Sequence, residues 1–408
     1  MEILRRVILM KPDEQACHAG IISRLRPLNM PVGLVLGLFT GCQGGFMDAF
    51  LSCSPMAASH FEGFIVRGMG LRRFGKVAGC LVLLVCGGCD QERKLESFGG
   101  PTMGSHYSVM YARASEQPEP AAVRPEVEAI LDEVDQQMSL WRTDSDIERF
   151  NALPANSCQA MPEPVLKMIG VGEQLSQESD GAFDLTIKPL MDLWGLGPHM
   201  LFEQMPLVRQ LARTQALVGY RNLRIVGDRL CKSAAVQVDL NSIAAGYAVD
   251  RISERMDALG LHDYLVQATG ELKVSGLKPD GSPWRVTLDA PLDDGNVMQK
   301  VFPLKGYAVS TSGDYRRYID HDGWRISDTL DALTGKPTSH GLASVTVIHP
   351  SALMADGLSS LLLILGPQQG WNYAQEHKIP AFFVIRADKR FIIRSNASFD
   401  RLVVEQSR

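Results

Sequence analysis

The chain of 408 residues has little cysteine in its main part and no large excess of either charge. Six of its eight cysteines lie in the first 89 residues, which leaves Cys158 and Cys231 further on. These two could pair in an oxidising compartment, although their spacing does not demand it. No Cys and His residues have the spacing of a zinc site. The formal charge is −5 and no basic face is evident, which argues against a nucleic-acid binder.

Repeats of fixed period and low-complexity tracts are also missing. The composition is 45% hydrophobic and 21% charged, which is typical of a globular protein with an ample core.

The amino-terminal region has the layout of an export signal. Three basic residues between 72 and 76 precede the apolar run Val77–Val85, which ends in Cys86-Gly87-Gly88-Cys89. Basic, apolar and small residues in this order are typical of a secretory signal, and the run is too short for a comfortable transmembrane helix. The final residues resemble the lipobox of bacterial lipoproteins, in which Cys89 would carry the lipid, although Cys86 stands where Leu is usual. A plain cleaved signal or an uncleaved anchor is the alternative.

A second run of this kind, Arg26–Cys42, lies further upstream. A protein is not expected to carry two export signals in tandem. We therefore expect translation to begin at Met69. The predicted organisation is therefore a non-mature region over 1–89 with its signal at Met69–Cys89, a polar tether over 90–99, and one domain over 100–408.

Helical and strand patterns alternate after residue 100. Apolar residues at helical spacing predict helices over 123–138, 164–178, 204–218 and 355–365, and a short helix over 145–151. Alternating patterns predict strands over 223–226, 237–240, 263–276, 284–290, 307–311 and 343–349, and a hairpin over 381–394 that turns at Ala387-Asp388. Interspersed elements with several strand-to-strand turns favour an α+β fold with largely antiparallel sheets, as a single intertwined domain.

The stretch Gln237–Asp250 has the pattern of a strand, a tight turn of small residues and a helix. Asp239 ends the strand, Asn241 and Ser242 are good N-cap types, and Gly260 stops the helix. A helix N-terminus favours anionic groups such as phosphate, and small residues let the backbone approach a bulky ligand. An ordinary strand-turn-helix without a ligand is the alternative.

Carboxylates and hydroxyls gather at the ends of several predicted elements. Asp356, Ser359 and Ser360 lie within one helical turn at the start of the helix predicted over 355–365. Their oxygen atoms are hard ligands that suit Mg²⁺. Asp and Ser are also ordinary N-cap residues, and these positions taken alone favour capping.

Several short motifs occur in one order along the chain. They are Thr102-Met103-Gly104-Ser105, Met138-Ser139 with Ser145-Asp146-Ile147 and Phe150-Asn151, Gly181-Ala182-Phe183-Asp184, Asp239-Leu240 with Gly246-Tyr247-Ala248, Ser310-Thr311-Ser312-Gly313-Asp314-Tyr315, Leu333-Thr334-Gly335-Lys336-Pro337, Ser344-Val345-Thr346-Val347 and Ala355-Asp356. Each motif is weak alone. The ordered set, over roughly residues 98 to 400, resembles the ApbE-type FAD:protein FMN transferases.

The resemblance implies an enzyme that binds FAD with Mg²⁺ and splits the pyrophosphate of FAD. Such enzymes transfer FMN to a Thr or Ser hydroxyl of a partner protein and release AMP. The implied partner is a flavin-acceptor protein, typically a subunit of a membrane electron-transfer complex. Together with the export signal, this predicts a lipoprotein anchored through Cys89 at the periplasmic face of the bacterial inner membrane.

The resemblance also implies which residues form the site. The residues that match the FAD positions are Met103, Trp141, Ala182, Phe183, Asp184, Asp239, Ala245 and Leu330. The residues that match the metal positions are Ser242, Asp356, Ser359 and Ser360. Trp141 stands where the family often has Tyr, and either ring can stack on an aromatic ligand. Ala245 replaces a usual Lys or Glu, so one polar flavin contact is expected to be missing.

The main departure from the family is Asp328, which stands where a His is usual and which we take as the catalytic position. Asp has a reference pKa near ~3.9 against ~6.5 for His, so it is a far poorer proton donor at neutral pH, although it can act as a base toward a hydroxyl. Two alternatives follow, namely a degenerate lipoprotein that binds FAD without transferring FMN, and an FAD pyrophosphatase. Other histidines that could replace the missing one are His262, His321, His340 and His349.

Overall fold

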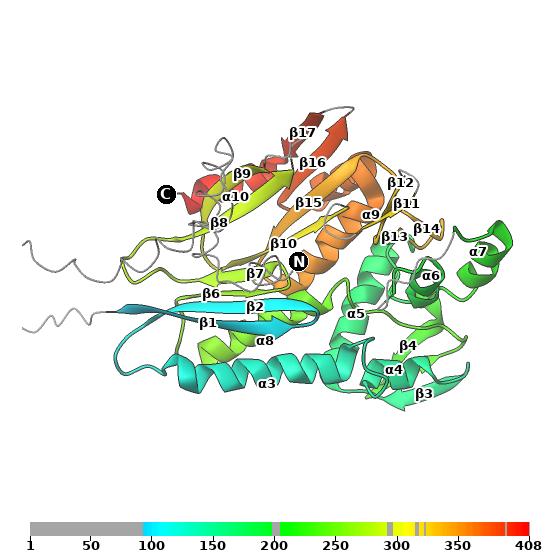
Figure 1. Cartoon of the computed structure of the whole chain (residues 1–408), viewed down its shortest axis with the longest axis horizontal. Coiled ribbons are helices and arrows are strands. Elements are labelled where there is room, and N and C mark those ends of the chain that lie inside the picture. The colour runs from blue at the N-terminus through cyan, green and yellow to red at the C-terminus, as the bar shows by residue number, and fades with distance from the viewer. Residues whose placement is uncertain are drawn as a thin grey trace, which may run out of the picture. The chain divides into compact units, whose positions relative to one another are not determined.

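An antiparallel sheet of eight strands forms the centre of the fold (Figure 1). The computed structural model describes residues 93–197, 205–291, 297–314, 318–321, 324–387 and 390–407. The expected export signal, Cys89 included, lies outside these residues. The strands follow the order β1 (Lys94–Thr102), β2 (Ser105–Arg113), β6 (Tyr264–Ala268), β7 (Glu271–Ser275), β10 (Tyr307–Gly313), β15 (Leu342–His349), β16 (Ala381–Ala387) and β17 (Arg390–Ser395).

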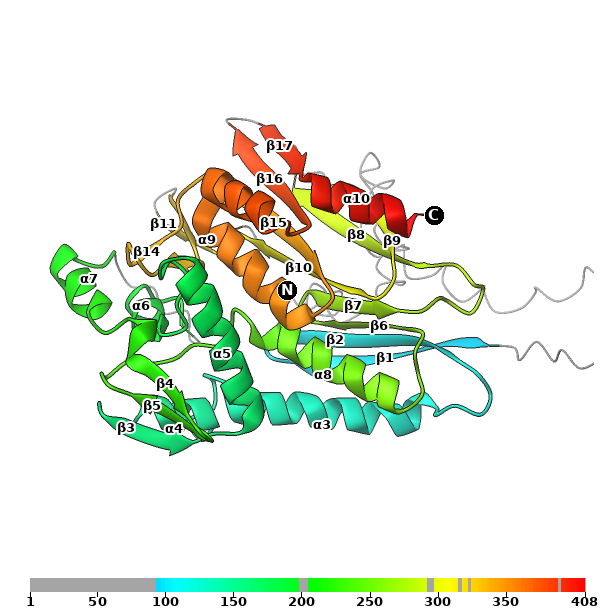
Figure 2. The same ribbon diagram turned by 180° about the vertical axis from the view of Figure 1, so that it is seen from behind.

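Helices cover one face of this sheet (Figures 1 and 2). They are α3 (Pro120–Met138), α5 (Glu163–Glu178), α8 (Ala244–Ala258) and α9 (Ala352–Glu376). The hairpin of β8 (Trp284–Pro291) and β9 (Val297–Leu304) covers the other face, together with α10 (Ala397–Gln406). Alternation along the strands divides the core accordingly: in β16, Phe383 packs in the helix-side cluster and Phe382 in the hairpin-side cluster.

Smaller elements lie beside the carboxyl half of α3 and around α6 (Figure 2). They are α4 (Asp146–Asn151), α6 (Lys188–Leu193), α7 (Val208–Gln215), a sheet of β3 (Ser157–Ala160), β5 (Arg229–Lys232) and β4 (Leu223–Val226), and the pairs β11 (Tyr318–His321) with β12 (Trp324–Ser327) and β13 (Leu330–Asp331) with β14 (Lys336–Pro337). Cys158 and Cys231 are opposite residues of β3 and β5 and form a disulfide.

The predicted α+β class with antiparallel sheets and one intertwined domain is confirmed. In the part of the chain that is described, no helix is both long and apolar enough to span a bilayer.

Several predicted boundaries were wrong. The tether expected over 90–99 overlaps β1, because Lys94–Thr102 pairs along its whole length with β2. Residues 237–240 form no strand; their sheet-like contacts are a bridge from Gln237 to Ile187 and a hydrogen bond from the Asp239 N–H to the Leu185 carbonyl. The helix predicted over 355–365 begins earlier, at Ala352, and continues past a kink at Gly366.

Candidate active site

Two adjoining cavities form one cleft between the start of α8, the first turns of α9 and the carboxyl end of β10. The smaller has a volume of about 280 Å³ and the larger about 660 Å³. Both are lined by Leu196, Asn241, Glu271 and Asp356, so the two spaces meet at these residues. Volumes of this size are typical of small-molecule sites.

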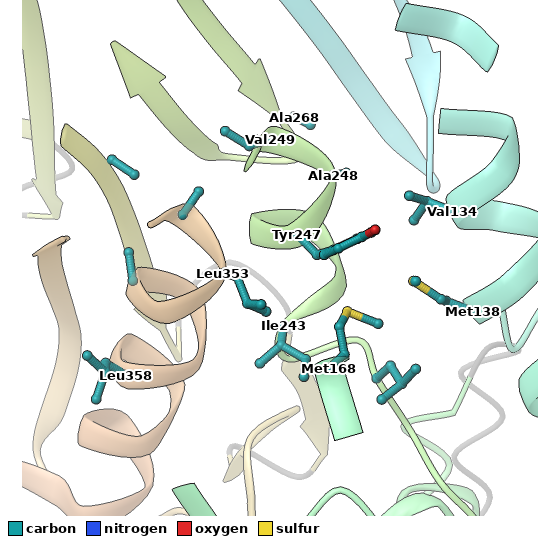
Figure 3. Close-up of a cluster of buried hydrophobic side chains, with 14 of the residues drawn as sticks. Val134, Met138, Met168, Ile243, Tyr247, Ala248, Val249, Ala268, Leu353 and Leu358 are labelled. Atoms are coloured by element: carbon teal, nitrogen blue, oxygen red, sulfur yellow. The ribbon is translucent and has the colours of Figure 1, made fainter. Parts of the chain in front are cut away.

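The position of Asp356 depends on close contact between α8 and α9. The Gly246 N–H of α8 donates to Asp356 Oδ2 at 2.9 Å. Around this contact Ile243 lies beside Leu353 of α9, while Tyr247 points toward α3 (Figure 3). The packing therefore brings the first turn of α8 against the second turn of α9.

Asp250, one turn further along α8, holds the start of α9. Its carboxylate accepts hydrogen bonds from the Ser351 hydroxyl at 2.7 Å and from the Ala352 and Leu353 N–H groups at 2.9 and 3.1 Å. Burial alone would raise the pKa of Asp250, but hydrogen bonds from these groups and from Lys273 lower it below its ordinary value. A carboxylate at a helix start is also favoured by the helix dipole.

Three residues with oxygen donors of different kinds line the smaller cavity beside this helix contact. The donors are the Asp356 carboxylate, the Ser360 hydroxyl and the Ser242 carbonyl, the last two 3.5 Å apart. Carboxylate, hydroxyl and backbone carbonyl oxygens are the ligand types that hard cations such as Mg²⁺ take, so this donor set fits one. Within the described ranges, no three His, Cys, Asp or Glu side chains gather as a metal cluster, and the set here contains a single carboxylate.

Ser359 is placed differently from the other three residues predicted to bind metal. It is fully buried, and its hydroxyl contacts Ser310 Oγ at 3.0 Å, Ser312 Oγ at 2.8 Å and the Asp356 carbonyl at 3.0 Å. It joins α9 to β10 and lines neither cavity as described. N-capping accounts for none of these residues, because Ser351 is the N-cap of α9 and Asp356 lies inside the helix.

Asp184 and Asp239 face the smaller cavity and are both buried. Asp184 accepts hydrogen bonds of 2.7 Å from the N–H and hydroxyl of Thr186 and from the Tyr220 N–H. Burial raises the pKa of Asp184, and these hydrogen bonds oppose the rise. Burial also raises the pKa of Asp239 to about 6, opposed by the Asn241 N–H and by Lys188.

Asp328 and Leu330 line the smaller cavity from the segment that leads into β13. Leu330 is buried in a cluster with Leu190, Trp194, Leu196 and Ile326. The Trp194 indole donates to the Gly335 carbonyl at 2.9 Å, which ties the β13–β14 turn to α6. This packing fixes the segment that carries Asp328.

All of the remaining predicted FAD residues except Ala182 line one of the two cavities. Met103, Trp141 and Ala245 line the larger one, and Trp141 is 58% exposed, which leaves its ring accessible. Phe183 lines the smaller one. Ala182 lines neither; its carbonyl accepts the Ala332 N–H, so it supports the β13–β14 turn.

The sequence reasoning missed several residues that line the cleft. These include Asn241, Glu271, Thr311, Ser312 and Thr329. Thr311 and Ser312 lie in a motif that supported the resemblance, so their place in that motif was a usable signal. None of the four histidines considered as substitutes lines either cavity as described.

Similarity to known proteins identifies the family of this chain. A model of the ApbE family matches residues 103–383. An FAD:protein FMN transferase of Vibrio cholerae is 33% identical over 318 residues, covering 78% of this chain and 95% of that protein. One of Haemophilus influenzae is 34% identical over 322 residues, covering 77% and 93%. The apo crystal structure of the flavinyl transferase ApbE of Pseudomonas stutzeri is 52% identical, covers 76% of this chain and 97% of that one, and superposes with a TM-score of 0.72. The chain belongs to the ApbE family.

Proposed function

We propose that the chain is a magnesium-dependent FAD:protein FMN transferase that modifies a Thr or Ser hydroxyl of an acceptor protein and releases AMP. The names of the relatives support the reaction. The observation that carries the proposal for this chain is that Asp356, Ser360 and Ser242 line one cavity of a cleft large enough for a nucleotide, with the Ser360 hydroxyl 3.5 Å from the Ser242 carbonyl.

Each part of the cleft has a role in this proposal. Asp356, Ser360 and the Ser242 carbonyl would hold Mg²⁺, which when bound neutralises charge on the pyrophosphate. Ser359 would not bind the metal itself. It would fix this part of α9 against β10 through its hydroxyl contacts with Ser310 and Ser312. Asp184 and Asp239 would fix the nucleotide, and Met103, Trp141 and Ala245 would surround its rings.

Asp328 would act as the general base. The acceptor hydroxyl oxygen attacks the phosphorus of the FMN half of FAD, and its proton passes to the Asp328 carboxylate. The new P–O bond to the acceptor forms as the P–O bond to AMP breaks, and AMP leaves. A carboxylate suits this step because it needs only to accept a proton.

The acceptor and the location follow from the same proposal. The acceptor would be a flavin-bearing subunit of a membrane electron-transfer complex, and the chain would be anchored through Cys89 at the periplasmic face of the inner membrane. The Cys158–Cys231 disulfide supports an oxidising compartment such as the periplasm.

AMP release in four mixtures tests the proposal. Purified protein and FAD are combined with or without Mg²⁺, and with or without a Thr-bearing acceptor domain. We expect AMP only when both are present. Asp356→Asn should abolish AMP release. Asp400→Asn on α10 is the control and should not, because among the contacts described the Asp400 carboxylate bonds only Ser395. AMP release without acceptor would instead indicate a pyrophosphatase, and FAD binding without AMP would indicate a binding protein.

A further inference from the structure

The segment Val236–Leu240 delivers Asp239 and Asn241 to the cleft without the support of a β-ladder. Val236, Val238 and Leu240 are fully buried. Regular strands fix their backbone through a row of hydrogen bonds to a neighbour, but here the sheet-like contacts are a bridge at Gln237 and one hydrogen bond from Asp239. The backbone groups of this segment must therefore find partners elsewhere.

Asn151, the last residue of α4, provides two of these partners. Its side-chain Oδ1 accepts the Val238 N–H at 2.7 Å, and its Nδ2 donates to the Val238 carbonyl at 2.9 Å. The amide thus replaces both hydrogen bonds that a strand neighbour would give Val238. Asn151 is buried, and Nδ2 also donates to Glu148 at 2.9 Å, which fixes the orientation of the amide.

Lys232, at the end of β5, binds the backbone of the same segment two residues earlier, at Val236. Its Nζ donates to the Val236 carbonyl at 3.0 Å and to the Asn151 carbonyl at 3.1 Å, and it lies 4.9 Å from the centre of the Phe150 ring. The side chain is 2% exposed. A buried ammonium is costly unless its donors are satisfied, and here carbonyls and an aromatic face satisfy it.

We propose that Asn151 and Lys232 are positioning residues that set the affinity for FAD by fixing the backbone just before Asp239. This rests on the proposed function. Neither residue lines the cleft as described, so they act through Val236 and Val238 on the adjacent Asp239 and Asn241. Loss of the Asn151 amide leaves both backbone groups of Val238 buried without these partners, and the segment relaxes away from the cleft.

The chain contains a matched control. Asn396 at the start of α10 is equally buried; its Oδ1 accepts the Ala381 and Phe399 N–H groups at 3.2 and 3.0 Å, and its Nδ2 donates to the Ile379 carbonyl. It binds backbone in the same manner but where β16 meets α10, and it lines neither cavity as described. A purely structural loss should therefore be alike for Asn151→Ala and Asn396→Ala.

The test is FAD binding by flavin fluorescence on the full-length protein, at a temperature at which each variant is folded. Asn151→Ala should weaken FAD binding by about tenfold or more, since buried backbone groups lose their partners. Lys232→Met should weaken it in the same direction, and the two changes together should do less than the product of the single effects. Asn396→Ala should lower the melting temperature but leave the FAD affinity unchanged.

Wild-type FAD affinity in a folded Asn151→Ala variant would overturn the inference, as would an equal loss in Asn396→Ala. If Asn151→Ala does not fold, Lys232→Met decides the question by the same measurement. Because the readout is FAD binding and not FMN transfer, a wild-type protein that binds FAD but modifies no acceptor would refute the proposed function and leave this test intact.

Discussion

Gly246 and Asp356 are in direct contact where α8 meets α9. The Gly246 N–H donates to Asp356 Oδ2 at 2.9 Å, and a Cβ at position 246 would lie 2.3 Å from the Ala352 carbonyl oxygen and 2.7 Å from the Asp356 Cβ. A side chain at this position therefore cannot coexist with the observed helix contact.

Gly246→Ala should push α9 away from α8 and displace Asp356. We expect a loss of stability of about 1–3 kcal/mol from overpacking, and a larger loss of Mg²⁺-dependent transfer. Gly170→Ala on α5 is the control, because a Cβ there meets no atom within 4 Å; it should be neutral or stabilising by about 0.5–1 kcal/mol. Urea unfolding and transfer assays measure both effects. Full transfer activity in Gly246→Ala would contradict the role assigned to the helix contact.

Asp239→Asn should change how stability depends on pH. The pKa of Asp239 is about 6 in the folded protein and 3.8 ordinarily, so the folded state binds this proton more tightly. The wild-type protein should therefore lose up to about 3 kcal/mol as the pH rises from about 4 to above 6. The variant should lack this loss and be more stable at pH 7, while binding FAD more weakly. Urea unfolding between pH 4 and 8 tests this; parallel curves for the two proteins would rule it out.

Asp328→Asn should lower FMN transfer by about 10²–10⁴-fold, the usual contribution of a general base. FAD affinity should remain, because the amide has nearly the shape of the carboxylate. Asp328→His should retain activity but place the acid limb of the pH–rate profile near pH ~6.5, where His ordinarily titrates. Transfer rates across pH measure both; an unaltered rate in Asp328→Asn would remove Asp328 from the mechanism.

Removing the disulfide should reduce stability and leave the chemistry unchanged. Cys158 and Cys231 are 73 residues apart in sequence; the entropy of closing a loop of this length corresponds to about 4 kcal/mol, and disulfides typically stabilise by about 2–4 kcal/mol. We expect the variant Cys158→Ser with Cys231→Ser to melt at a lower temperature and to bind FAD normally at a temperature at which it is folded. Equal melting temperatures in the oxidised wild-type protein and the variant would contradict the estimate.

The positions predicted most accurately from the sequence were those of helices with one apolar face buried in the core. Apolar residues at helical spacing located α3, α5 and α8 to within a few residues, because each buries one face in the helix-side core, α3 and α8 against the sheet and α5 against α9. The start of α9 was misplaced, because its first turn depends on Ser351 as the cap and on Asp250 from a distant helix.

The strand expected over 237–240 shows what local patterns cannot reveal. Val238 and Leu240 alternate with polar residues as in a strand, although Asp239 is buried as well. The backbone of Val238 is instead bound by the side chain of Asn151, and that of the preceding Val236 by Lys232, which no local pattern identifies. The same limit applied to the cleft: the resemblance named Asp356 and Ser360 as metal positions, whereas Asn241 was predicted only as an N-cap type and Glu271 was not among the predicted site residues.

The intact mass of an acceptor domain tests the central claim most directly. The protein is incubated with FAD, Mg²⁺ and a purified Thr-bearing acceptor domain, alongside the same domain with that Thr replaced by Ala. We predict a mass gain equal to one FMN less one water on the Thr-bearing domain, one AMP released per acceptor modified, and no gain on the Ala domain or with Asp356→Asn. An unmodified Thr-bearing domain in the presence of bound FAD and Mg²⁺ would contradict the account.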